Sequence, residues 1–183
     1  MVVSKGKSPF SKTVKEIIEW VSSIAAALIF VTLLFTYVFR VVGVSGSSMN
    51  PTLSTGDRVI ISGLFYEPKY GDIVVTTQSD EDDKPLIKRV IAVGGQTVKI
   101  DSESGDVYVD GKLLEESYIS GKTFETGDMV GEIIVPEGEV FLMGDNRAIS
   151  LDSRFNEIGT IDERHILGKV YLRIWPFSEI ELY

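Results

Sequence analysis

Residues 20–39 read WVSSIAAALIFVTLLFTYVF and contain no charged side chain. As an α-helix that rises about 1.5 Å per residue, this stretch would reach roughly 30 Å, the thickness of a bilayer's hydrocarbon core. Trp20 at its start, and Tyr37 and Arg40 at its end, are residue types that favour membrane interfaces. A buried core helix normally keeps a polar stripe, whereas this stretch is apolar on all sides. The sequence therefore predicts a transmembrane helix.

The flanks of this helix predict an uncleaved anchor with its N-terminus in the cytoplasm. Several lysines precede it and Arg40 alone follows closely, and positive charges collect on the cytoplasmic side. A cleavable secretory signal would have a shorter apolar region followed by small residues, which this chain lacks there. We expect a single-pass protein of the cell membrane, with a cytoplasmic tail at 1–16, a transmembrane anchor at 17–40 and an extracytoplasmic domain at 41–183.

Composition excludes several kinds of chemistry. The formal net charge is −9, and the excess of acids lies after Arg40, so the domain should repel nucleic acid. The absence of cysteine excludes disulfides, thiolate metal sites and cysteine-based catalysis. The lone histidine, His165, excludes a multi-histidine metal centre. Its charged neighbours favour an ordinary surface histidine, although a Ser-His-Asp triad stays arithmetically open.

After the anchor, short β-branched runs alternate with glycine turns. Asp110-Gly111 is a two-residue hairpin signal. The acidic run 79–84, SDEDDK, lacks the alternating ligands of an EF-hand, which favours a solvated loop over a metal site. The predicted fold class is mainly β: one N-terminal transmembrane helix followed by an antiparallel β domain. Strands are predicted at residues 58–62, 72–76, 86–93, 97–100, 107–109, 112–114, 132–135, 139–143 and 168–174.

The stretch 45–53, SGSSMNPTL, directly follows the predicted membrane exit. Its glycine and serines would suit a flexible linker. Pro51, however, restricts the chain to an extended or turn conformation close to Ser48. A hydroxyl held by rigid neighbours can be aimed, so Ser48 is the candidate nucleophile, and it needs a base.

Lys88, in the predicted strand LIKRVIAV, is the candidate base. Alternate residues share one face of a strand, so Lys88 points where Leu86 and Val90 point. Burial on that face would lower the pKa of the lysine toward neutrality, as a general base requires. The opposite face is almost as apolar, so a lysine that snorkels from a strand edge explains the periodicity equally well.

Residues 141–154, FLMGDNRAISLDSR, pass from an apolar strand into a short loop dense in Asp, Asn, Arg and Ser. Such a loop can be solvated, with exposed ion pairs. Its position directly after a strand also suits a hydrogen-bonded network that holds a neighbouring base in place. From the residues alone, both interpretations stay open.

In this order behind an anchor, these stretches resemble the bacterial type I signal peptidases. The family's Ser-Met-x-Pro-Thr-Leu motif is matched by residues 48–53, and its Gly-Asp-Ile-Val strand by residues 71–74. Its Lys-Arg pair is matched by residues 88–89, with Val-Gly-Gly after it at 93–95. Its Gly-Asp-Asn-Arg loop, continuing to Ser-x-Asp-Ser-Arg, is matched between residues 144 and 154. The short length, the single anchor and the lysine, where endoplasmic-reticulum relatives have histidine, are similar to the Gram-positive branch.

The resemblance implies a membrane-bound serine endopeptidase that cleaves N-terminal signal peptides from exported preproteins with a serine/lysine dyad, Ser48 and Lys88. The expected partners are signal peptides and the lipid bilayer, with no cofactor, no metal and no predicted oligomeric state. The residues with implied supporting roles are Ser150, which would orient the lysine amine; Asp145, Arg147, Asp152 and Arg154, which would form a scaffold; and Met49 and Pro51, which would bind substrate.

Two positions depart from the family pattern. Ile149 stands where members usually have asparagine, so the polar support of that residue is lost. Gly46 stands where some members carry a hydroxyl, so the sequence does not assign a second oxyanion donor. The alternative from another class is a catalytically inactive, membrane-anchored peptide-binding module. A self-cleaving, repressor-like serine/lysine protease is disfavoured by the anchor and by the missing DNA-binding segment.

Overall fold

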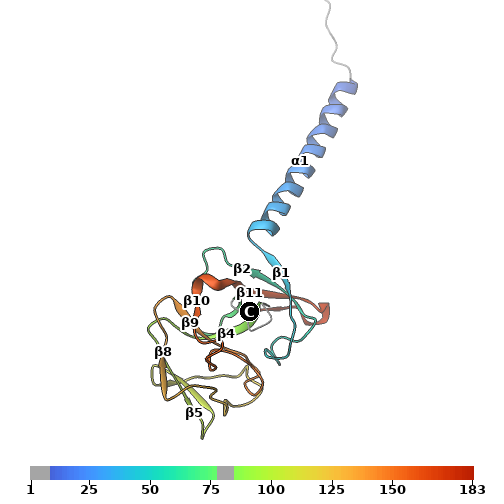
Figure 1. Cartoon of the computed structure of the whole chain (residues 1–183). Helices are drawn as coiled ribbons and strands as arrows, with labels where there is room; N and C mark the ends of the chain where they lie inside the picture. The colour runs from blue at the N-terminus through green and yellow to red at the C-terminus, as the bar shows by residue number, and fades with distance from the viewer. Residues whose placement is uncertain (1–8, 78–84) are drawn as a thin grey trace, which may run out of the picture. The chain divides into compact units, whose positions relative to one another are not determined.

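The computed structural model describes residues 9–77 and 85–183, so the acidic run 79–84 lies outside the described residues. The chain divides into two compact units at the junction of Phe39 and Arg40 (Figure 1). The first unit contains α1 (Pro9–Tyr37). Within it, residues 12–36 form a helix long and apolar enough to cross a membrane, with a mean hydropathy of 2.2, and none of the apolar window is buried. Length and composition thus agree with the predicted span.

Polar residues inside α1 direct their hydroxyls back to the helix. Ser23, Thr32 and Thr36 each donate to the backbone carbonyl four residues earlier, at 2.7–2.8 Å. Because these hydroxyls are satisfied within the helix, they add little cost in an apolar environment.

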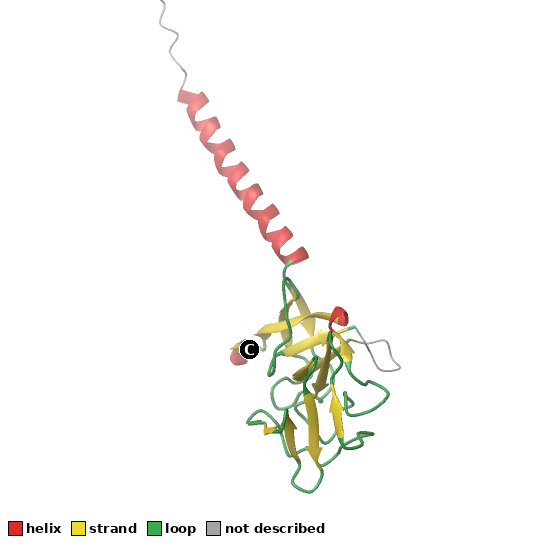
Figure 2. Cartoon of the chain, turned by 90° about the vertical axis from the view of Figure 1, so that its left-hand side faces the viewer, coloured by secondary structure: helices red, strands yellow, loops and turns green. Residues whose placement is uncertain are grey.

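Two antiparallel sheets build the second unit, the β domain (Figure 2). The eight-stranded large sheet has the order β1-β2-β11-β3-β4-β9-β10, with β12 paired to β11, and the four-stranded small sheet has the order β7-β6-β5-β8. The strands are β1 (Arg40–Gly43), β2 (Arg58–Ser62), β3 (Ile73–Thr76), β4 (Leu86–Val93), β5 (Thr97–Asp101), β6 (Asp106–Val109), β7 (Lys112–Leu113), β8 (Glu132–Ile134), β9 (Glu139–Met143), β10 (Ile161–Asp162), β11 (Ile166–Trp175) and β12 (Glu181–Leu182), with short 3-10 helices η1 (Glu163–His165) and η2 (Phe177–Glu179).

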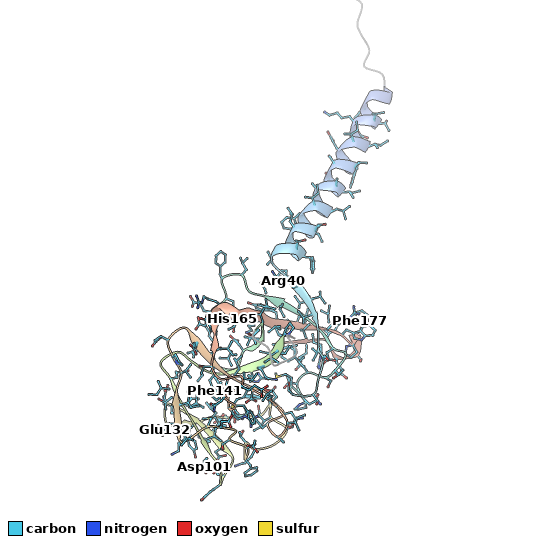
Figure 3. The ribbon with its side chains drawn as sticks, viewed as in Figure 1. Arg40, Asp101, Glu132, Phe141, His165 and Phe177 are labelled. Carbon is cyan, nitrogen blue, oxygen red and sulfur yellow. The ribbon has the colours of Figure 1, made fainter. Side chains whose placement is uncertain are left out.

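The sheets share one hydrophobic core cluster. Phe141 and Ile91 of the large sheet pack there with Val98 and Val107 of the small sheet, and all four side chains are fully buried. In Figure 3, Phe141 lies between the small sheet, marked by Asp101 and Glu132, and the part of the domain marked by Phe177 of η2. Burial of this apolar surface holds the two sheets together.

The predicted antiparallel β domain is confirmed, and each predicted strand overlaps an observed one. Asp110 and Gly111 have φ angles of 51° and 72°, the left-handed conformation that a tight two-residue hairpin requires. The sequence does not predict β1, β10 or β12. The latter two contain only two residues each, too few for a periodic pattern, and the valines of β1 extend the apolar run of the helix.

Two features of this fold position the site. β4 pairs with β3 from Leu86 to Arg89 but with β9 only from Arg89 onward. Among the described residues, the β9 side of residues 86–88 therefore has no strand partner. In addition, the segment between β7 and β8 joins two strands of the small sheet, and its residues contact Arg89 of β4 and Arg147 of the loop after β9. We call its residues 115–125 the strap.

Candidate active site

Ser48 lies in a turn that follows β1. The turn is closed by backbone hydrogen bonds from Asn50 N to Ser47 O, at 3.2 Å, and from Leu53 N to Met49 O, at 2.9 Å. Met49 and Leu53 are 2 % and 0 % exposed and pack into the core of the large sheet. The turn is thus anchored on both sides of the serine, as a nucleophile requires and a flexible linker does not provide.

Lys88 reaches this turn from β4. Its Nζ lies 2.9 Å from Ser48 Oγ, within hydrogen-bond distance, and the residue is only 4 % exposed. Leu86 and Val90 pack into a common core cluster, as the strand periodicity predicts for that face. The interpretation of Lys88 as a lysine that snorkels into water is therefore wrong.

A cavity of about 310 Å³ opens beside these two residues. Its walls are residues 42–46 of β1 and the segment after it, the turn at Ser48 and Met49, and residues 85–88 at the start of β4. Two backbone edges therefore border the cavity: β1, which ends the large sheet, and the half-paired start of β4. An extended peptide could add to such edges as a further strand.

The loop after β9 is a buried network of charges. Arg147 binds Glu116 of the strap with both terminal nitrogens, at 2.5 and 3.0 Å, and donates to Gly144 O. Arg154 forks onto Asp152, at 2.7 and 2.9 Å. Both arginines are 1 % exposed, so these ion pairs are buried and not the exposed pairs of a solvated loop. Buried ions that are fully paired and hydrogen-bonded rigidify the backbone around them.

Gly144 and Ser150 touch the nucleophile turn. A Cβ on Gly144 would lie 2.5 Å from Ser48 O and would also collide with Ser150 Oγ, so only glycine fits here. Ser150 is 3 % exposed, and its hydroxyl has no hydrogen-bond partner among the described residues. The structure thus places Ser150 against the Ser48 turn, with a buried hydroxyl still available for bonding.

Arg89 and Asp145 connect the strand of the lysine to the turn of the serine. Arg89 forks onto Asp145 at 2.8 and 2.7 Å, and Thr52 Oγ1 donates to the same carboxylate at 2.5 Å. Burial opposes the charge of Arg89, but the hydrogen bonds and charge of Asp145 outweigh it and raise the pKa of the guanidinium. The next residue, Asn146, donates from its backbone to Ser48 O and from its side chain to Ser47 O.

The structure brings most of the predicted site residues together. Ser48 and Lys88 are in contact, Asp145 and Ser150 lie against the Ser48 turn, and Arg147, Asp152 and Arg154 are buried in the same loop. Met49 lines the cavity beside Ser48, whereas Pro51 lines a second cavity on the other side of the turn. His165 is exposed in η1, as expected for a surface histidine.

Sequence reasoning missed the contribution of the strap. Glu116, Thr123 and Tyr118 contact the arginines of the site, but they follow no motif and lie far from it in sequence. A buried arginine needs a carboxylate partner, but the chain has 27 acidic residues. The sequence pattern therefore could not identify Glu116 as the partner of Arg147.

Comparison with known proteins defines the class and then the family. Residues 17–175 match the family described as signal peptidase, peptidase S26, so the protein is a serine peptidase. The chain is 35 % identical over 185 residues to signal peptidase IB of Staphylococcus aureus, covering 91 % of this chain and 94 % of that protein. It is 38 % identical over 173 residues to signal peptidase I of Bacillus licheniformis, covering 88 % and 90 %. The chain belongs to the signal peptidase family, as the sequence motifs predict.

Among solved structures, a signal peptidase I from Enterococcus faecalis aligns with a TM-score of 0.47 and 25 % identity. The alignment covers 57 % of this chain and 97 % of that one.

Proposed function

We propose that this protein is a membrane-anchored endopeptidase that removes N-terminal signal peptides from exported preproteins, with Ser48 as nucleophile and Lys88 as general base. The observation that carries the proposal is the 2.9 Å contact between Lys88 Nζ and Ser48 Oγ beside a cavity with two open strand edges. Membership of the signal peptidase family supports the choice of substrate.

Lys88 acts as the base in its neutral form. An amine that is 4 % exposed loses most of its hydration, which disfavours the ammonium form. The neutral Nζ takes the proton of Ser48 as the hydroxyl oxygen attacks the scissile carbonyl. The ammonium so formed gives its proton to the leaving amine as the peptide bond breaks, which leaves an acyl-enzyme on Ser48 and restores the neutral Nζ. Nζ then deprotonates the water that hydrolyses the acyl-enzyme and returns the proton to Ser48 Oγ. Each proton transfer thus uses one nitrogen that is already within hydrogen-bond distance of the nucleophile.

The groups around the dyad stabilise and orient it. The backbone N–H of Ser48 donates to the developing oxyanion. Ser150 has a buried hydroxyl that makes no hydrogen bond to any described residue, so it is available to bond to the lysine amine and orient it during the reaction. Asp145, Arg147, Asp152 and Arg154 keep the loop rigid, because their pairs are buried and multiply hydrogen-bonded.

The substrate binds as an added strand along the cavity, against the edge of β1 and residues 86–88. Met49 contributes to the wall of the cavity beside the cut. Pro51, which the resemblance also assigns to substrate binding, lines the second cavity, so we assign it only the role of shaping the turn that presents Ser48. Small side chains are preferred at the first and third positions before the cut. Helix α1 is the single membrane anchor, with residues 1–16 cytoplasmic, 17–40 in the bilayer and 41–183 outside. The anchor keeps the enzyme where signal peptides leave the bilayer.

The decisive test is cleavage of a synthetic signal peptide with an Ala-x-Ala site by the purified full-length protein in detergent micelles. Mass spectrometry should find one cut directly after the second alanine. Ser48→Ala and Lys88→Ala should each abolish cleavage, with circular dichroism and thermal unfolding unchanged.

Two matched controls should stay active. Ser47→Ala removes the neighbouring exposed hydroxyl, and Lys99→Ala removes an exposed lysine from the small sheet. If the wild-type protein binds the peptide without cutting it, the inactive peptide-binding module replaces our proposal. Substantial cleavage by Lys88→Ala would remove the dyad mechanism.

A further inference from the structure

Tyr118, in the strap, covers Arg89, the cation that follows Lys88 in β4 and binds Asp145. The guanidinium carbon of Arg89 lies 3.9 Å from the centre of the Tyr118 ring, a cation–π stacking distance. The ring is held in place because its hydroxyl donates to Glu116 at 3.0 Å, and Glu116 is itself fixed by Arg147. Burial raises the pKa of the Tyr118 hydroxyl, so it remains a neutral donor.

The position of Arg89 affects both reacting groups. Arg89 is the residue next to Lys88 in β4, and its fork holds Asp145. Asp145 in turn accepts the hydroxyl of Thr52 from the Ser48 turn. A shift of the Arg89–Asp145 pair would therefore move the serine and the lysine relative to each other.

Tyr118 also separates this ion pair from solvent. A cavity of about 410 Å³ on the far side of the turn is lined by Arg89, Tyr118, Thr52 and Arg173. Despite this opening, Arg89 is only 8 % exposed, because the aromatic ring lies on one face of its guanidinium. Without the ring, water from this cavity would reach the pair and weaken it by raising the local dielectric constant.

We propose that Tyr118 is a positioning residue for the peptidase reaction, acting through Arg89 to hold the Ser48 turn against Lys88. The inference rests on the proposed function. Tyr118 does not line the cavity that contains Ser48, so its effect falls on the rate of the chemical step and not on substrate binding. The contact also extends the active-site support to the small sheet, from which the strap comes.

The test compares Tyr118→Phe, Tyr118→Leu and Tyr118→Ala with the wild-type protein, using the full chain in detergent micelles and the synthetic signal peptide. Phenylalanine keeps the π face, leucine keeps only apolar cover, and alanine removes both. We expect kcat to fall by less than about twofold for the phenylalanine variant, by about threefold for the leucine variant and by about tenfold for the alanine variant. KM should stay unchanged in all three variants. Tyr108→Ala, on the outer face of the small sheet, is the matched control and should keep its kcat.

Ionic strength provides a readout that a merely structural role would not move. Once the Arg89–Asp145 pair is exposed, salt should screen it. Raising the salt concentration should therefore lower kcat in the alanine variant more than in the wild type. If Tyr118→Ala does not fold, the test rests on the other two variants. The inference then requires that kcat of Tyr118→Leu is lower than kcat of Tyr118→Phe.

The inference is overturned if Tyr118→Ala or Tyr118→Leu keeps the wild-type kcat, if phenylalanine loses as much as leucine, or if KM alone changes. These outcomes leave an active wild-type enzyme, so they are distinct from failure of the proposed function, in which the wild-type protein does not cut the peptide.

Discussion

The two sheets of the β domain contribute to the site in different ways. The large sheet carries the two groups in contact, Ser48 Oγ and Lys88 Nζ, on a turn and a strand that share its core. The small sheet sends the strap, which contacts the arginines that hold the neighbouring loop. The difference teaches that the Ser48–Lys88 contact is built within one sheet, whereas its support spans both sheets. Substitutions in the large sheet should remove the chemistry, and those in the strap should lower stability or rate.

Lys88→Arg should have the largest effect. It tests whether a substitution in the large sheet removes the chemistry. Arginine is also long and basic but does not lose its proton in proteins, so it cannot act as a base. We expect the rate of signal-peptide cleavage to fall by at least about 10³-fold while the thermal unfolding midpoint changes little. Lys99→Arg is the control. Activity within tenfold of wild type would show that a neutral amine is not needed.

Gly144→Ala tests how closely the polar loop must approach the turn. The added methyl would lie 2.5 Å from Ser48 O, so either the turn or the loop must move. A displacement of this size should lower the cleavage rate by about 10²-fold. Gly121→Ala, in the strap, adds a methyl into open space and should be neutral. Equal rates for the two variants would contradict the close packing described here.

Glu116→Ala tests whether a substitution in the strap lowers the stability of the protein. It leaves Arg147, which is 1 % exposed, without its carboxylate, and an uncompensated buried charge should lower the free energy of unfolding by about 3 kcal/mol. Lys122→Ala breaks an ion pair of the same strap that is exposed, so it should leave stability unchanged. Denaturant unfolding of the two variants measures the contrast. A stable Glu116→Ala protein would show that the strap is not needed to hold the loop.

Ile149→Asn should have the smallest effect. The side chain of Ile149 is 59 % exposed at the edge of the loop, and asparagine is the residue that the resemblance to signal peptidases predicts at this position. The cleavage rate should stay within about twofold of wild type or increase, because a surface position tolerates the change. A severe loss would mean that Ile149 contacts a part of the site that the loop network does not explain.

The sequence predicts the contact between Ser48 and Lys88 better than the residues that support it. Local patterns locate the apolar helix, the strands and the three stretches that carry Ser48, Lys88 and the loop, because hydrophobic periodicity and turn residues are local signals. Burial of Lys88 is ambiguous in the sequence, since both faces of β4 are apolar, and the fold decides it. Glu116 and Tyr118 are found only in the structure, because their contacts join segments that are distant in sequence.

Lys88 and Arg89 point to opposite faces of β4, which has a consequence for the register of that strand. If β4 slipped by one residue, the guanidinium would meet the serine hydroxyl and the amine would meet Asp145. The slipped protein would have the same composition, yet a permanently protonated guanidinium would stand beside the serine and could not accept its proton. Activity in this protein thus depends on strand alignment as much as on the identity of its side chains.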